Sequence, residues 1–176
     1  MSTEDTNRKG AGLNGLARKL VTGWAILGGV VLIAVVIMQS ISVVTGAFGH
    51  PLPGDFELTE LGIAVAMFAF LPYCQMTDAN VTADIFTSGA SRRVLGVLGV
   101  LASVIALAFS VIMVWRTWAG MENQFDYGYQ TAILGLSIGY AFLPIIVSLI
   151  LLALASIMTL IESFRQTVQP SGKVYS

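Results

Sequence analysis

Few residues of this chain have the type and spacing that catalysis or metal binding requires. His50 is the only histidine and Cys74 is the only cysteine, so one chain supplies neither a His and Cys metal site nor a pair of histidines for haem. No G-x-x-x-x-G-K-[ST] sequence is present, which argues against a phosphate-binding loop and ATP hydrolysis. We therefore expect a protein that is not an enzyme, with no catalytic, cofactor-binding or metal-binding residues.

The acidic and basic side chains flank long apolar runs and do not interrupt them. Glu57 and Glu60 lie where the second run begins, Arg116 lies near the end of the third, and Glu122 and Asp126 follow it. Ion-coupled carriers keep charged groups inside the membrane despite their cost, so the lack of such groups at the centres of the runs favours a supporting role. We expect Arg116 to pair with one of these four carboxylates and to tie helix ends together at one rim.

Four apolar runs fill most of the 176 residues, of which 56% are hydrophobic and only 11% are charged. A helix of about 20 apolar residues crosses the hydrocarbon core and satisfies its own backbone hydrogen bonds there. The sequence therefore predicts an all-α membrane protein with four transmembrane helices, at about residues 20–45, 58–76, 94–118 and 133–161. We expect the chain to divide into a cytoplasmic N-terminal segment, the four-helix domain and a cytoplasmic tail, at residues 1–19, 20–161 and 162–176.

The positions of the basic residues predict the orientation. Eight of the nine Lys and Arg residues lie in the N-terminal segment, between the second and third helices, or in the C-terminal tail. These segments share one side of the membrane, and an excess of Lys and Arg marks the cytoplasmic side. We therefore expect both termini in the cytoplasm. The connection between the second and third helices mixes polar and apolar residues, and is either a short interfacial helix or a solvated loop.

Several polar and aromatic side chains have expected places along the helices. Gln39 and Gln75 are positioned to hydrogen-bond between helices, and either Asp55 or Thr59 is expected to cap the second helix. Trp24 lies near the cytoplasmic end of the first helix, at the depth where indoles favour the headgroup boundary.

The fourth apolar run is longer than a vertical span requires and contains Pro144, so we expect a tilt or a kink. Gly135 and Gly139 form a G-x-x-x-G spacing near its outer end. Small residues at this spacing let two helix backbones approach closely in lipid, although such spacings also arise by chance in apolar helices.

Three short stretches resemble the small membrane subunit, often called Q, of tripartite ATP-independent periplasmic (TRAP) transporters. Residues 54–61 (GDFELTEL) are similar to the family's aromatic and acidic start of the second span. Residues 80–84 (NVTAD) resemble a family stretch of His, aliphatic, any residue, aliphatic, Asp. Residues 130–136 (QTAILGL), followed by Tyr140 and Pro144, are similar to the start of the family's last span.

The resemblance covers about Leu20 to Ile161, with departures at three positions. Asn80 stands where the family often has His, and Ser137 and Ile138 stand where a Pro and an aromatic residue are common. These departures leave the subfamily and the substrate open.

The resemblance implies a division of labour. In that family a large multi-span (M) subunit carries the substrate, driven by an ion gradient that is usually sodium, and a periplasmic binding (P) protein delivers an organic acid. This chain is then expected to be the DctQ-like permease subunit in the bacterial inner membrane, which scaffolds the large subunit for uptake of a small, dicarboxylate-like acid. The expected partners are the large subunit, the binding protein and membrane lipids, with no nucleic acid. The residues expected to serve the subunit interface or the structure are Glu57, Glu60, Asp84, Arg116, Gly135, Gly139 and Pro144.

Two other classes remain open from the sequence. A membrane anchor of an electron-transfer enzyme would bind a cofactor that absorbs visible light. A self-associating four-span channel or efflux protein would transport solute without a partner. The shortage of polar residues inside the runs argues against the second class.

Overall fold

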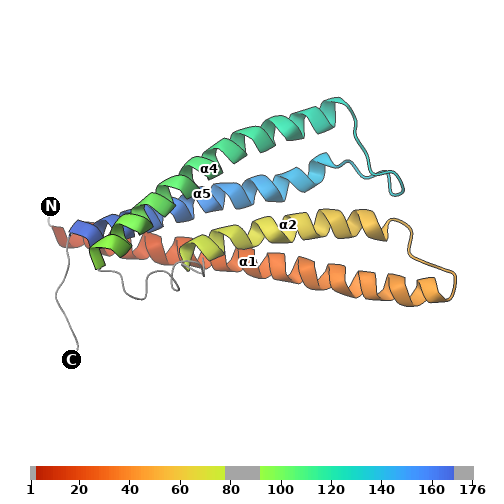
Figure 1. Ribbon diagram of the computed structural model, residues 1–176, viewed down its shortest axis with the longest axis horizontal. Coiled ribbons are helices and arrows are strands. Elements are labelled where there is room, and N and C mark those ends of the chain that lie inside the picture. The colour runs from red at the N-terminus through yellow and green to blue at the C-terminus, as the bar shows by residue number, and fades with distance from the viewer. Residues whose placement is uncertain (1–2, 78–91, 169–176) are drawn as a thin grey trace.

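The computed structural model describes residues 3–77 and 92–168, which form four helices (Figure 1). They are α1 (Thr3–Ala47), α2 (Asp55–Met76), α4 (Arg92–Asp126) and α5 (Gly139–Val168). Each contains a stretch long and apolar enough to cross a membrane, at Gly15–Ala47, Asp55–Met76, Val97–Asp126 and Gly139–Phe164. The predicted all-α membrane fold with four spans is confirmed. The predicted interfacial helix lies outside the described residues, as do Asn80 and Asp84.

The helices form two antiparallel pairs, α1 with α2 and α4 with α5, and the pairs meet chiefly where α2 packs on α5. The pairs lie close together at the end where α1 begins and α5 ends, and they separate toward the opposite end (Figure 1). We call the first the terminus end. The second carries the connections 48–54 and 127–138, and we call it the loop end.

The terminus end holds a cluster of buried apolar residues. Val21, Met76 and Ala155 are buried together there, from α1, α2 and α5. Within the α1–α2 pair the two backbones approach closely, because a Cβ placed on Gly28 would lie only 2.6 Å from the Cβ of Ala69. Small residues therefore set the spacing between α1 and α2.

Polar side chains join the helices inside the apolar spans. The Thr59 hydroxyl donates a 3.0 Å hydrogen bond to Gln39 Oε1, between α2 and α1. The Gln75 amide donates to Thr159 Oγ1 at 3.2 Å, and the Ser103 hydroxyl donates to the same oxygen at 3.2 Å, so one threonine joins α2, α4 and α5. The expected interhelical roles of Gln39 and Gln75 are confirmed.

The start of α2 meets the expected capping by Asp55 only in part. The residue before the helix is Gly54, with a φ of 77°, and it has no side chain to cap the helix, but Asp55 Oδ1 accepts a 2.8 Å hydrogen bond from the N–H of Phe56 in the first turn. Thr59 bonds to Gln39 instead, and Asp55 is the first helical residue. A left-handed backbone at this position favours glycine, which leaves no side-chain oxygen for capping.

The start of α5 also differs from the expected run. The apolar run begins near residue 133, but the helix begins at Gly139. Gly135 lies in the connection with a φ of 64°, so Gly135 and Gly139 do not share a helix face. The interpretation of these two glycines as a G-x-x-x-G contact face of one helix is therefore wrong, because Gly135 is not helical. The connection contains no charged residue, and hydropathy alone does not separate it from the helix that follows.

Candidate functional site

Glu57 closes the loop end by binding the backbone of the α4–α5 connection. Its Oε1 accepts a 2.8 Å hydrogen bond from the N–H of Ile133, and its Oε2 accepts a 3.1 Å bond from the N–H of Leu134. The Thr131 side chain and the Ala132 N–H also lie beside this carboxylate. We call this arrangement of Glu57 with residues 131–134 the loop clasp. It attaches the α1–α2 pair to the α4–α5 pair where the helices themselves have separated.

The connection held by the clasp is compact. The N–H of Leu136 donates a 3.1 Å hydrogen bond to the Thr131 hydroxyl, and Gln130 forms an isolated antiparallel bridge with Ser137. Leu134 packs over Gly54, where a Cβ would lie 2.4 Å from the leucine Cγ. Gly54 therefore meets two requirements: it adopts the left-handed backbone of the turn, and it leaves room for the Leu134 side chain.

The first turn of α2 makes a second polar contact. Asp55 Oδ2 accepts a hydrogen bond from the Ser42 hydroxyl on α1. The Ser42 oxygen in turn accepts a 3.3 Å bond from the N–H of Leu52. Through Ser42, these two hydrogen bonds attach the connection 48–54 to α1 and to the start of α2. Two of the three carboxylates in the first two turns of α2 therefore bind groups of the chain itself.

Glu60 and Arg116 are exposed, and in the described part of the chain neither makes a hydrogen bond or an ion pair. Glu122 instead accepts a 2.9 Å hydrogen bond from the Trp118 indole on its own helix. The structure thus does not bring Arg116 together with the carboxylates expected to pair with it. A contact of Glu60 or Arg116 with another subunit stays a prediction.

Gly139 and Pro144 both lie on the first turns of α5. A Cβ on Gly139 would come within 2.7 Å of the Phe125 ring, so this glycine allows α4 and α5 to meet closely. The same ring packs edge-on against Tyr140, with centroids 5.6 Å apart. Pro144 lies inside the helix, where it cannot donate a backbone hydrogen bond.

Trp24 makes a contact that the sequence does not reveal. Its indole N–H donates a 2.9 Å hydrogen bond to the Ser148 hydroxyl on α5. The Ser148 hydroxyl donates in turn to the Pro144 carbonyl at 2.8 Å. Trp24 therefore joins α1 to α5, whereas the sequence places its indole in the headgroup region. A tryptophan near a span end is ambiguous, because either a lipid headgroup or a serine on a neighbouring helix accepts its proton.

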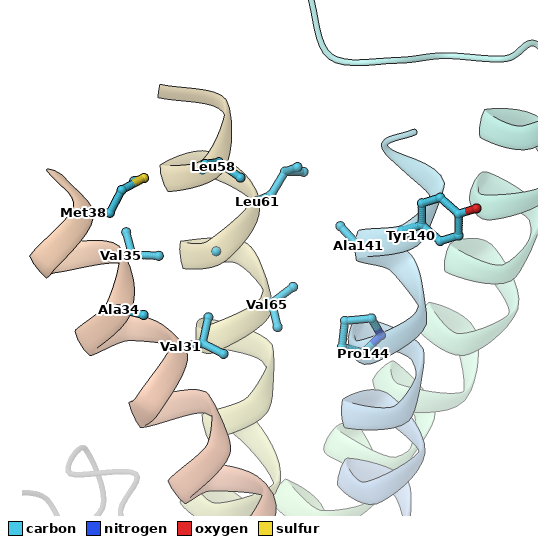
Figure 2. Close-up of a pocket in the computed structure, with 11 residues that line it drawn as sticks. Val31, Ala34, Val35, Met38, Leu58, Leu61, Val65, Tyr140, Ala141 and Pro144 are labelled. Carbon is cyan, nitrogen blue, oxygen red and sulfur yellow. The ribbon is translucent and has the colours of Figure 1, made fainter. Parts of the chain in front are cut away.

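An open apolar groove of about 530 Å³ lies between the two helix pairs, in the half nearer the loop end. Figure 2 shows Leu61 and Val65 pointing from α2 toward α5, with Ala141 and Pro144 on the facing side. The remaining lining residues are Val31, Ala34, Val35, Met38, Leu58, Gly62 and Tyr140. We call this space the interpair groove.

The site thus contains structural hydrogen bonds and apolar surface. Among the residues whose side chains the structure describes, 15–77 and 97–164, no three His, Cys, Asp or Glu side chains gather where they would hold a metal ion. The loop clasp is not predicted from the sequence, because Glu57 and residues 131–134 are distant in the chain. One signal was available: an uncharged connection with free backbone N–H groups needs an acceptor from elsewhere.

Four apolar helices joined by part-buried polar contacts define a multi-pass α-helical membrane protein. Residues 32–166 match the family described as "Tripartite ATP-independent periplasmic transporters, DctQ component". The match covers well over half of the chain, so the chain belongs to this family, the small permease component of TRAP transporters. No curated protein and no solved structure matches the chain.

Proposed function

We propose that this protein is the scaffold on which the large (M) subunit of a TRAP transporter works during ion-gradient-driven uptake of a small, dicarboxylate-like organic acid. A periplasmic binding (P) protein delivers the acid, and the large subunit carries it. The chain itself catalyses no reaction. Membership of the DctQ family supports a transporter subunit over an electron-transfer anchor or a self-sufficient channel.

The observation that carries this proposal is the position of charge in the described spans. Asp, Glu, Lys and Arg lie toward the ends of the four helices, and the middle of each span has none. The polar groups that do lie inside, such as Gln75 and Thr159, are used to join helices. A chain without a charged group at mid-membrane lacks the side chains that ion-coupled carriers commonly use there to bind a coupling ion or an anionic substrate.

The apolar surface of the chain supports a partner in the membrane. The helices α1 and α4, at the two sides of the assembly, expose large hydrophobic side chains along their lengths. On α4 these include Val97, Leu101, Val104, Ile105, Phe109, Ile112 and Trp115. Either lipid or another subunit covers such a surface, and a scaffold needs one face of this kind for its partner.

We place the protein in the bacterial inner membrane with both termini in the cytoplasm. The basic residues of the N-terminal segment, of the α2–α4 connection and of the tail support this orientation. The loop end then faces the periplasm. Accessibility to a membrane-impermeant thiol reagent, with single cysteines at Ser2 and at His50 in a Cys74→Ser background, tests the orientation. Labelling of intact cells is expected at position 50 and not at position 2.

Affinity purification from native membranes tests the scaffold role directly. The tagged chain is extracted in mild detergent, and the proteins that remain bound are identified by mass spectrometry. We expect a much larger multi-span protein in roughly equal amount. An unrelated tagged four-span protein, expressed to the same level, controls for adhesion to detergent micelles. Recovery of this chain alone, in a defined oligomer, would contradict the proposal.

Uptake measured in cells that express the three components tests the transport role. We expect uptake of an organic acid only when this chain, the large subunit and the binding protein are present together. Exchange of sodium for another cation in the medium identifies the coupling ion. Equal uptake without this chain would show that the large subunit needs no scaffold.

A further inference from the structure

The α1–α2 pair is held together along most of its length. A Cβ on Gly28 would lie 2.6 Å from a side chain of α2, and two turns nearer the loop end a Cβ on Gly62 would overlap the Val35 side chain. Close to the loop end, the Ser42 hydroxyl donates a hydrogen bond to Asp55 of α2. Close backbone contact at several levels makes α1 and α2 one stiff unit.

The α4–α5 pair is joined in the same way. Toward the terminus end, a Cβ on Gly99 would lie 2.8 Å from Ser163 Oγ of α5. Toward the loop end, a Cβ on Gly120 would lie 3.2 Å from the Phe142 ring, and the Phe125 ring packs against the first turn of α5. The second pair is therefore also one stiff unit.

The contacts between the two pairs gather toward the terminus end. The buried cluster of Val21, Met76 and Ala155 lies there, together with the hydrogen bond from Gln75 to Thr159. Toward the loop end the pairs separate, and the interpair groove lies open between them (Figure 1). Two stiff units that are packed at one end and parted at the other have the geometry of a hinge.

At the loop end the pairs meet again through the α4–α5 connection. Glu57 of α2 binds the N–H groups of Ile133 and Leu134, and the Leu134 side chain packs over Gly54. These hydrogen bonds lie at the surface, where water can replace them one at a time. The hinge is therefore closed by a contact that can open without disturbing the packing of either pair.

We propose that the loop clasp is a latch. In its closed state it holds the two helix pairs at one separation at the loop end. In its open state it lets them pivot, as two bodies, about their contacts at the terminus end. The width of the loop end then depends on one side chain, Glu57. This device does not depend on the scaffold role proposed above.

The length of the helices makes a small pivot measurable. From Trp24, which is hydrogen-bonded to α5, to Ser42 near the loop end, α1 rises ~27 Å at 1.5 Å per residue. Domain rotations of ~10° are common in hinged proteins. Over this lever such a rotation displaces the loop end by ~5 Å.

Pulsed electron paramagnetic resonance tests the proposal. The full chain, in a Cys74→Ser background, is reconstituted in lipid nanodiscs with spin labels at two introduced cysteines. Val43 on α1 and Asn123 on α4 are exposed near the loop end, so Val43→Cys with Asn123→Cys reports the separation of the pairs. Val43→Cys with Met67→Cys, and Asn123→Cys with Ile150→Cys, report distances within each pair, again at exposed positions.

Two variants open the latch and one serves as the matched control. Glu57→Gln weakens the clasp, and Glu57→Ala removes it. Glu60→Gln changes an exposed carboxylate one turn further along α2. We expect the Glu57 variants to add a population ~5 Å longer to the distance between positions 43 and 123. The Glu60 variant and both distances within the pairs should match the wild-type protein. Gel filtration shows which Glu57 variant is folded, and one folded variant suffices.

Three results would overturn the proposal. The first is the same distance between positions 43 and 123 in the wild-type protein and in the folded Glu57 variants. The second is an equal change in Glu60→Gln, since a lost charge and not the clasp would then be the cause. The third is a change within either pair as large as the change between them, because the pairs would then not move as bodies.

Discussion

Glu57 on α2 and Ile133 in the α4–α5 connection are 76 residues apart in the chain, yet the carboxylate of the first accepts a 2.8 Å hydrogen bond from the backbone N–H of the second. The other carboxylate oxygen binds the next N–H, that of Leu134. Hydrogen bonds to an ionised carboxylate are stronger than those between neutral groups. This contact therefore holds together the end of the molecule where the helix pairs lie farthest apart.

Replacement of Glu57 by Gln should loosen the loop clasp. The amide keeps the shape but loses the charge and one of the two acceptor oxygens. We expect faster hydrogen exchange at the N–H groups of Ile133 and Leu134, and a lower melting temperature in detergent. Glu60→Gln removes an exposed carboxylate without a partner in the described chain, one turn further on, and should leave both measurements unchanged. Equal exchange in the two variants would count against the clasp.

Replacement of Gly28 by Ala should separate α1 from α2. The new Cβ would lie 2.6 Å from the Cβ of Ala69, which is well inside normal contact distance. Overpacking of this kind costs about 1–3 kcal/mol in the free energy of unfolding. Gly23→Ala, on the same helix with nothing within 4 Å, should be neutral or stabilising by up to ~1 kcal/mol. Steric-trap unfolding in bicelles measures both, and equal values would show that α1 and α2 are not in tight contact.

Replacement of Trp24 by Phe removes the hydrogen bond to Ser148 and keeps most of the apolar area. We expect a loss of about 0.5–1.5 kcal/mol in the free energy of unfolding. Trp115→Phe is the matched control, because Trp115 is 70% exposed and its indole has no partner in the described chain. An equal loss in both variants would count against a stabilising hydrogen bond between Trp24 and Ser148.

Replacement of Glu60 or Arg116 by Ala should reduce assembly with the large subunit. Both side chains are exposed and unpaired in the described chain, so each is free to pair with another subunit. An exposed ion pair contributes up to about 1 kcal/mol, which corresponds to roughly fivefold weaker association. Co-purification of the large subunit and uptake should fall together.

Arg116→Lys keeps the positive charge and should retain most of the assembly, which separates a charge contact from a packing contact. Normal assembly and normal uptake in both alanine variants would reject these roles for Glu60 and Arg116.

Hydropathy predicts the four spans well, because a membrane requires a long apolar helix at each crossing. It fails at the start of α5. Residues 131–138 are uncharged, and they end as a compact loop because Gly135 adopts a positive φ and Glu57 binds the backbone from another helix. The contact with Glu57 cannot be predicted from the local sequence of residues 131–138, because Glu57 lies on another helix.

The candidate site is predicted less completely than the fold. Gln39 and Gln75 were identifiable because an amide inside an apolar run needs a partner. Arg116 suggested ion pairs, but the carboxylate of Glu57 is already occupied by backbone N–H groups. The interpair groove depends on which faces of α2 and α5 meet, and apolar residues all around a helix give no sign of that choice.

The pairing of α2 with α5 has a consequence for the order of synthesis. The α1–α2 hairpin leaves the ribosome first and inserts with the Glu57 carboxylate still lacking its backbone partners, which are made 76 residues later. Only when the second hairpin has inserted do the amides of Ile133 and Leu134 reach this carboxylate. In a truncated chain that stops before them, water alone would solvate this carboxylate and the α1–α2 hairpin would lack its link to the second pair, so the clasp forms only in a completed subunit.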